Sequence, residues 1–147
     1  MGYKRKAHII FLSEADQLSL MAATMANAYG VEWLEGCAVT LERASHVTSN
    51  ASVAQIMQEI GLELNTQMQV LDEALLQWAD LVVTMDETVK NACPTLPPGV
   101  QLRHYPFPDP GAVHVPLIEC RLIRDSVRAR IEGMIGGMRL MQNAAGE

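Results

Sequence analysis

Serine and acidic residues gather in one short stretch near the N-terminus, after the apolar run Ala7–Leu12 and before a helical pattern. Such a strand-to-helix turn is where α/β proteins usually hold an anion, because unpaired N–H groups and the helix dipole converge there. The turn consists of Ser13, Glu14, Ala15, Asp16, Gln17, Leu18 and Ser19, with no Gly, Lys, Arg, Cys or His. Its position therefore suits phosphate chemistry, but its two carboxylates would repel a dianion.

Four acidic side chains follow predicted strands and could in principle converge: Glu14, Asp16, Asp86 and Asp109. Carboxylate oxygens are ligands that suit Mg²⁺ or Ca²⁺. Only their shared position at strand ends supports such a site, and two of them have simpler explanations. Asp16 is a candidate helix cap, and Asp109 is a common turn residue in the stiff Pro106–Pro110 loop. We therefore predict no metal site and no cofactor.

Three widely spaced cysteines, Cys37, Cys93 and Cys120, are the remaining reactive side chains. They form no C-x-x-C motif and no metal-ligand spacing with the four histidines. Neither a disulfide framework nor a metal site is indicated by this arrangement. Packing as small residues in or near the core explains them without a redox role.

Strand-like apolar runs alternate with helical patterns along the chain, which is the order expected of a parallel sheet. The predicted strands are Ala7–Leu12, Val31–Val39, Asp80–Met85 and Val100–Tyr105. The predicted helices are Asp16–Tyr29, Ala51–Ile60, Leu71–Ala79 and Leu117 to about Met141, with a short helix or turn at Asp86–Ala92. This pattern predicts a single α/β domain over residues 1–147, a three-layer sandwich with helices on both faces of a four-stranded parallel sheet. Ligands in such sheets bind beyond the carboxyl ends of the strands, so the loops there should face one crevice.

Helix boundaries and faces follow from the same pattern. Asp16 can cap the first helix and Gly30 can end it. In the last helix, apolar residues with helical spacing predict the buried face: Leu117, Ile118, Leu122, Val127, Ile131, Met134, Ile135 and Met138. We expect the arginines at 121, 124, 128 and 130 on the wetter side and the glycines at 133, 136 and 137 to fray the end.

Composition narrows the classes of partner. The 147 residues carry a net charge of −6, which argues against nonspecific binding to nucleic acid or to an anionic membrane. No apolar run approaches the roughly 20 residues that span a bilayer, and the run Ala7–Leu12 is too short for a signal peptide. We therefore expect a cytoplasmic protein that contacts neither nucleic acid nor membrane.

Several segments, in this order and at these spacings, resemble the low-molecular-weight protein tyrosine phosphatases and the thioredoxin-coupled arsenate reductases that share their fold. They are Val53–Leu64, Leu71–Met85, Asn91–Pro94, Pro97–Val100 and His104–Pro110. The resemblance covers nearly the whole chain, and the last three segments are more similar to the arsenate-reductase branch. It implies a parallel sheet with the strand order 2-1-3-4.

The family's chemistry depends on a Cys-x5-Arg-Ser loop after the first strand, in which a thiolate attacks while N–H groups and the Arg hold the oxyanion. The resemblance places Ser13 at the nucleophile position, and Leu18 or Ser19 at the Arg position depending on the register. Loss of a nucleophile has lowered the rate roughly 10⁶-fold in a well-studied hydrolase. Loss of a transition-state Arg lowers phosphoryl transfer roughly 10³- to 10⁵-fold. A serine also needs a general base, and the loop contains none.

The resemblance also assigns family roles to further positions of this chain. Asp109 matches the general acid, although without a nucleophile to serve it would be vestigial. Of the two cysteines that arsenate reductases use as a redox relay, the first position is Asp86 and the second is Cys93. One thiol cannot complete an intramolecular relay, so Cys93 is a redox candidate only through a mixed disulfide.

The leading hypothesis is a catalytically inactive family member that acts as a binding or regulatory module. Its partner would be an unidentified protein or a small anion held by Ser13–Ser19. The alternative is an active phosphatase or arsenate-reductase-related enzyme of altered chemistry, using Cys93 for redox exchange or assisted by Asp109. A third hypothesis is a homodimer formed through the Met-rich segment Met134–Met141, for which ordinary core packing is the simpler explanation.

Overall fold

Five parallel strands form one sheet in the computed structural model, which describes residues 6–42 and 50–145. The strands are β1 (Ala7–Leu12), β2 (Leu34–Thr40), β3 (Gln69–Val70), β4 (Leu81–Thr84) and β5 (Gln101–His104). Their order is β3-β2-β1-β4-β5, and every neighbouring pair is parallel. The four longer strands have the predicted order 2-1-3-4, so the predicted α/β fold class is confirmed.

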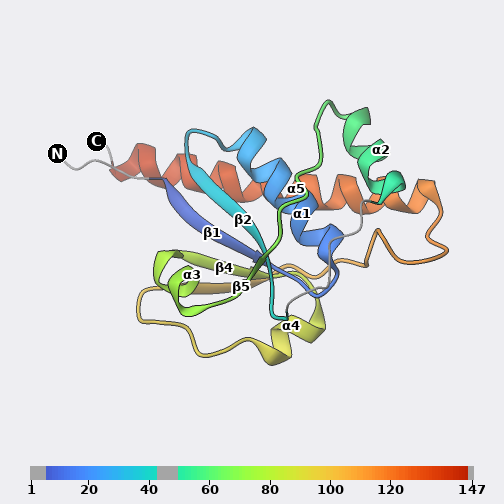
Figure 1. The fold of residues 1–147 in the computed structure, drawn as a ribbon. Coiled ribbons are helices and arrows are strands. Elements are labelled where there is room, and N and C mark those ends of the chain that lie inside the picture. The colour runs from blue at the N-terminus through green and yellow to red at the C-terminus, as the bar shows by residue number, and fades with distance from the viewer. Residues whose placement is uncertain (1–5, 43–49, 146–147) are drawn as a thin grey trace.

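Helices cover both faces of this sheet (Figure 1). They are α1 (Asp16–Tyr29), α2 (Ala51–Glu59), α3 (Glu73–Trp78), α4 (Glu87–Ala92) and α5 (Leu117–Ala145). Alternate residues of a strand point to opposite faces. Accordingly Ile9 and Phe11 pack in the larger core with residues of α1, α2 and α5. Ile10 and Leu12 pack in a smaller core with residues of α3 and α4.

The edge strand β3 and the start of β2 differ from the prediction. β3 has only two residues, both exposed, so it leaves no hydrophobic pattern in the sequence. β2 begins at Leu34 and not at Val31, because the chain first turns after α1: the N–H groups of Trp33 and Leu34 both donate to the carbonyl of Gly30. Gly30 ends α1 as predicted, with its own N–H bonded to the carbonyl of Ala26.

The predicted capping role of Asp16 is wrong. Asp16 is the first residue of α1, Ala15 occupies the cap position, and no cap side chain bonds the helix. The Ser13 hydroxyl instead accepts from the N–H of Ser19 in the first turn. A side chain before the turn therefore does what a capping residue would do.

Helix α5 corrects two predictions. It continues through its glycines to Ala145, because Met134 and Ile135 are buried in the larger core and packing outweighs low helix propensity. Its faces also differ: Ile118 and Leu122 are 67% and 63% exposed, whereas Arg124 is buried. Arg124 bonds the carbonyl of Ile56 and the carboxylate of Glu59, both on α2. A paired arginine can therefore occupy a position that the periodicity assigns to the wetter side.

The carboxyl ends of β1, β4 and β5 lie side by side in the sheet. Leu12 pairs with Val39 and Thr84, and Thr84 pairs with His104. The residues that follow these strands are Ser13, Met85 and Tyr105. As predicted for a parallel sheet, the loops that could do chemistry leave the sheet side by side.

Candidate functional site

The loop after β1 is held between its two neighbouring strands. The N–H of Ser13 donates to the carbonyl of Val39 at 3.1 Å, and the N–H of Met85 donates to the carbonyl of Leu12 at 2.9 Å. The residue after Met85 is Asp86, the N-cap of α4. The register of β1 and β4 therefore brings Asp86 beside the loop, although 72 positions separate Asp86 from Glu14.

The Asp86 carboxylate occupies the backbone donors of this loop. Its Oδ2 accepts from the N–H of Glu14 at 2.7 Å and from the N–H of Ala15 at 3.1 Å. Its Oδ1 accepts from the N–H of Val89 at 3.0 Å, which caps α4. One carboxylate thus satisfies N–H groups at the start of α4 and in the loop that leads into α1. These loop N–H groups are of the type that binds an oxyanion at a helix N-terminus.

The Ser13 hydroxyl is fully buried and engaged within the loop. Its Oγ donates to the carbonyl of Ala15 at 2.6 Å and accepts from the N–H of Ser19 at 3.2 Å. Over residues 6–42 and 50–145, no carboxylate or imidazole bonds this hydroxyl. A serine nucleophile needs such a base, and both bonds of the Ser13 hydroxyl are made within its own loop and the first turn of α1.

The other loop residues divide between the core and the surface. Gln17, Leu18 and Ser19 are buried, Ala15 and Asp16 are half-buried, and Glu14 is exposed. The hydroxyl of Ser19 donates to the carbonyl of Asp16 at 3.2 Å. The loop therefore presents carboxylates and no cation at its accessible surface.

Asp109 forms a tight turn. Its Oδ1 accepts from the N–H of Gly111 at 2.8 Å, which is the turn bond that aspartate commonly makes. Gly111 lies against the start of α1, because a Cβ at this position would come within 2.6 Å of Gln17 Cγ. The loop of Asp109 thus packs on the first turn of α1, and the carboxylate stabilises that loop.

A chain of polar side chains connects β4, β5 and α4. Thr84 Oγ1 lies 2.8 Å from His104 Nδ1, and His104 Nε2 lies 3.1 Å from Glu87 Oε1. The order hydroxyl, imidazole and carboxylate resembles a catalytic triad, but Thr84 is fully buried and no substrate can reach it. The chain fixes the start of α4, where Asp86 lies, against β5. In the sequence His104 was distinguished only by the family resemblance.

The three thiols lie in packed surroundings. Burial raises the pKa of the Cys93 thiol, and burial together with Glu35 raises the pKa of Cys37 to about 11. Burial also raises the pKa of Cys120, whose Sγ donates to the carbonyl of Pro110 at 3.2 Å. Cys37 and Cys93 both pack against the smaller core. Raised pKa values disfavour the thiolate, which is the reactive form.

Within residues 6–42 and 50–145, no three His, Cys, Asp or Glu side chains come together as a group able to hold a metal ion. Glu14, Asp16, Asp86 and Asp109 therefore do not form the cation site that their positions allowed. In the same part of the chain, no helix has the length and apolarity needed to cross a bilayer.

Arsenate reductases are among the curated proteins with sequences similar to this chain. One from Staphylococcus aureus is 32% identical over 110 residues, which are 74% of this chain and 82% of that protein. Arsenate reductase 2 from Staphylococcus haemolyticus is 34% identical over 84 residues, which are 56% of this chain and 63% of that protein. The match thus spans less than two thirds of the latter relative's length. No protein-family model matches the chain.

Solved structures agree on the fold. An arginine phosphatase from Geobacillus stearothermophilus superposes with a TM-score of 0.79 at 16% identity, covering 94% of this chain and 96% of that one. A low-molecular-weight protein tyrosine phosphatase from T. tengcongensis gives 0.77 at 16% identity, covering 90% and 99%. A reduced arsenate reductase gives 0.71 at 20% identity, covering 90% and 98%. The architecture expected from the sequence resemblance is thus present.

Proposed function

This chain belongs to the arsenate reductase family, and from that premise we propose that it is a binding or regulatory module that turns over neither arsenate nor phosphate at its first loop. In this proposal the chain keeps the family's fold, and the loop after β1 has lost the ability to transform oxyanions.

The position of the Asp86 carboxylate carries this proposal. An oxyanion at the loop would need the N–H groups of Glu14 and Ala15, which already donate to Asp86. An incoming dianion would have to displace one carboxylate and then lie near those of Glu14 and Asp16, with no loop cation to balance them. These carboxylates would repel a dianion bound beside them, most strongly where water is excluded.

The Ser13 hydroxyl supports the same conclusion. To attack, Ser13 Oγ would have to break its bond to the carbonyl of Ala15 and transfer its proton to a base. The buried thiols do not replace it, because their raised pKa values keep them protonated at neutral pH.

A second candidate is an arsenate-reductase-related enzyme of altered chemistry, which the names of the relatives favour directly. In this candidate Cys93 would exchange with an external thiol, or Asp109 would donate a proton. The Asp109 carboxylate already accepts a hydrogen bond from the N–H of Gly111. Cys93 supplies only one of the two thiols that an intramolecular relay needs.

Turnover assays distinguish the two candidates. The purified chain is tested for hydrolysis of p-nitrophenyl phosphate and for thioredoxin-coupled arsenate reduction, with the Staphylococcus aureus relative as a positive control. We expect rates equal to those of Ser13→Ala, Asp109→Asn and Cys93→Ser variants, and equal to buffer. Turnover that one of these substitutions abolishes would contradict the proposal, and turnover lost in Cys93→Ser or in Asp109→Asn but not in Ser13→Ala would establish the second candidate.

A further inference from the structure

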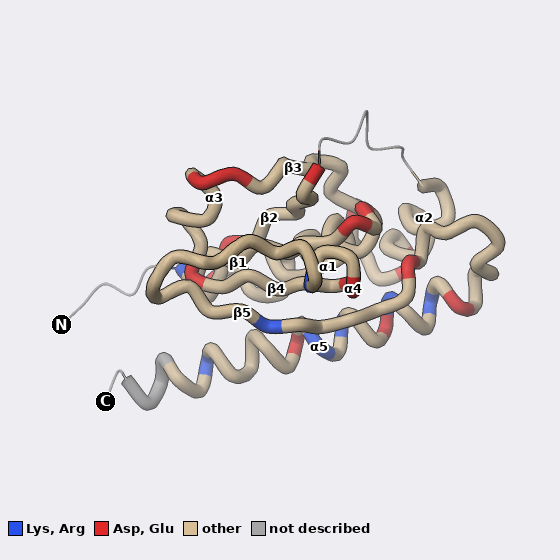
Figure 2. The backbone as a smooth tube through the Cα atoms, turned by 90° about the horizontal axis from the view of Figure 1, so that it is seen from below, with Lys and Arg blue, Asp and Glu red and all other residues tan. Residues whose placement is uncertain are grey.

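A cleft of about 890 Å³ lies between β5 and α5, away from the loop after β1. Its sheet wall is formed by alternate residues of β5 and the segment after it, including Arg103, Tyr105 and Phe107. Its helix wall is a stripe of α5 that includes Arg130, Gly133 and Gly137. Figure 2 shows α5 running beside β5 along this side of the molecule. A cleft of this volume is within the range of pockets that bind small ligands.

Missing side chains on α5 open the cleft. A Cβ at Gly133 or at Gly137 would meet no atom within 4 Å. Both glycines are exposed, so the helix wall of the cleft is open to solvent at these positions. Met134 and Met138 line the cleft beside them, so this part of the wall is apolar.

Two guanidinium groups meet at Tyr105, at one end of the cleft. Arg130 lies over the Tyr105 ring, 4.5 Å from its centroid, and Arg103 Nη1 donates to the Tyr105 hydroxyl at 3.3 Å. Among the described residues neither guanidinium has a carboxylate partner, whereas three of the other four α5 arginines, at 121, 124 and 128, each have one. In a chain of net charge −6, two adjacent cations without a carboxylate favour an anionic group here.

Asp80 lines the opposite end of the cleft, and its carboxylate accepts from the N–H of His8 at 2.8 Å. An anionic head group is attracted to Arg103 and Arg130, so the cationic end of the cleft lies at Tyr105.

We propose that this cleft binds a linear aliphatic carboxylate. The carboxylate accepts from Arg103 and Arg130, which suit planar oxyanions, and the chain lies along Gly133 and Gly137 beside Met134 and Met138. An unbranched chain suits this wall because the two glycines, about one helical turn apart, carry no side chain between the methionines. The inference is independent of what the loop after β1 does.

Titration calorimetry of the full chain with dodecanoate tests the proposal, with dodecanol as the uncharged probe and hexaglutamate as an acidic peptide. We expect dodecanoate to bind, and dodecanol to bind roughly tenfold or more weakly because it lacks the charge-assisted bonds. Absence of dodecanoate binding, or equal binding of dodecanol, would overturn the proposal. Binding of hexaglutamate in place of dodecanoate would overturn it in favour of a peptide site.

Matched variants locate the site. Gly137→Leu fills the cleft and should abolish dodecanoate binding, whereas Gly136→Leu lies outside the lining, also meets no atom at its Cβ, and should leave binding unchanged. Arg103→Gln with Arg130→Gln should weaken binding roughly tenfold or more, and Arg139→Gln on the same helix should not. Circular dichroism confirms the fold of each variant. Equal effects of the two leucines, or of the arginine double variant and Arg139→Gln, would contradict the assignment.

Discussion

Asp86 uses its two carboxylate oxygens for two different purposes. Oδ1 caps α4, and Oδ2 holds the N–H groups of Glu14 and Ala15. Asp72 makes the same kind of cap at α3 through the N–H of Leu75, and within residues 6–42 and 50–145 its carboxylate bonds no other loop. Comparing substitutions of Asp86 and Asp72 therefore separates the stability that the loop bonds of Asp86 provide from the stability that a helix cap provides.

Asp86→Asn should destabilise the protein more than Asp72→Asn does. An asparagine has one acceptor oxygen, so at position 86 its amide NH₂ would face either the cap donor or the loop donors. Leaving such donors unsatisfied costs about 1–3 kcal/mol, whereas Asn and Asp are nearly equal as caps. Urea denaturation measures both variants. Equal losses of unfolding free energy would contradict the bridging role of Asp86.

The thiols should label slowly at neutral pH. Burial raises the pKa of Cys93 and, with Glu35, that of Cys37, so the thiolate fraction grows only in alkaline solution. Iodoacetamide labelling followed by peptide mass spectrometry should give rates that increase through the alkaline range. A Cys93 that labels at a constant rate from neutral pH upward has a low pKa, and that result would revive the redox hypothesis.

The sequence located the loop after β1 as the candidate site, but it did not predict the contact between this loop and Asp86. The hydroxyls of Ser13 and Ser19 bond carbonyl groups within the loop, as serines at a strand end and a helix start commonly do. The contact of Asp86 depends on the register of β1 against β4, which no local pattern specifies. The acid after the neighbouring strand was the only available signal.

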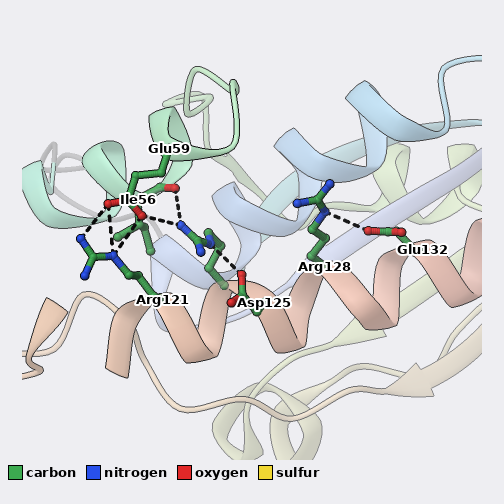
Figure 3. Close-up of polar contacts among 7 residues, drawn as sticks. Ile56, Glu59, Arg121, Asp125, Arg128 and Glu132 are labelled. Atoms are coloured by element: carbon green, nitrogen blue, oxygen red, sulfur yellow. Dashed lines mark hydrogen bonds and ion pairs between the residues drawn. The ribbon is translucent and has the colours of Figure 1, made fainter. Parts of the chain in front are cut away.

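At the scale of elements, α2 and α5 are joined by ion pairs around Glu59 (Figure 3). Its carboxylate accepts from Arg121 at 2.8 Å and from Arg124 at 2.7 Å. Hydrogen bonds from Arg121 and Arg124 lower the pKa of Glu59 from 4.5 to about 2. The side chain is about one-third exposed, so water screens part of this interaction.

Glu59→Gln should remove a pH-dependent part of the stability. Because the folded-state pKa of Glu59 is depressed, its contribution is complete above pH 4.5 and disappears as the pH falls toward 2. Thermal melts from neutral to acidic pH should therefore find the variant less stable than the wild type at neutral pH, with the difference shrinking below pH 4.5. Glu132→Gln, which removes the Arg128 pair, is the control. A difference between wild type and Glu59→Gln that does not change with pH would contradict this account.

Hydrophobic periodicity predicted the bounds of some helices and strands correctly. The bounds of β1 and α1 follow from apolar spacing and from Gly30, and the structure agrees. The buried face of α5 was mispredicted at Arg124, because its partners lie on α2. Pairing between distant elements reverses the burial that a single helix pattern indicates.

At the scale of the molecule, the alternation of strands and helices was enough to predict the layered α/β architecture. The edge strand β3 was missed, since two exposed residues carry no pattern. The order of the sheet matters for function, because it is the adjacency of β1 and β4 that brings Asp86 to the loop.

The whole molecule should be monomeric in solution. The Met-rich segment proposed for self-association divides between two environments: Met134 is buried in the chain's own core, and Met141 is 74% exposed. Leu140 is also 72% exposed, but two exposed apolar side chains are far less than the surface that a stable dimer interface buries. Light scattering should give the mass of one chain at micromolar concentration, and a dimer mass would support the homodimer hypothesis instead.

The central claim is that the loop's anion-binding donors are occupied by the protein's own carboxylate. The most direct test is a titration of the ¹⁵N-labelled chain with arsenate at constant pH and ionic strength, observing the amide resonances of Glu14 and Ala15. We predict that neither resonance shifts up to millimolar arsenate, because both N–H groups donate to Asp86. Saturable shifts of both resonances would contradict the claim, since arsenate would then be replacing Asp86 in the loop.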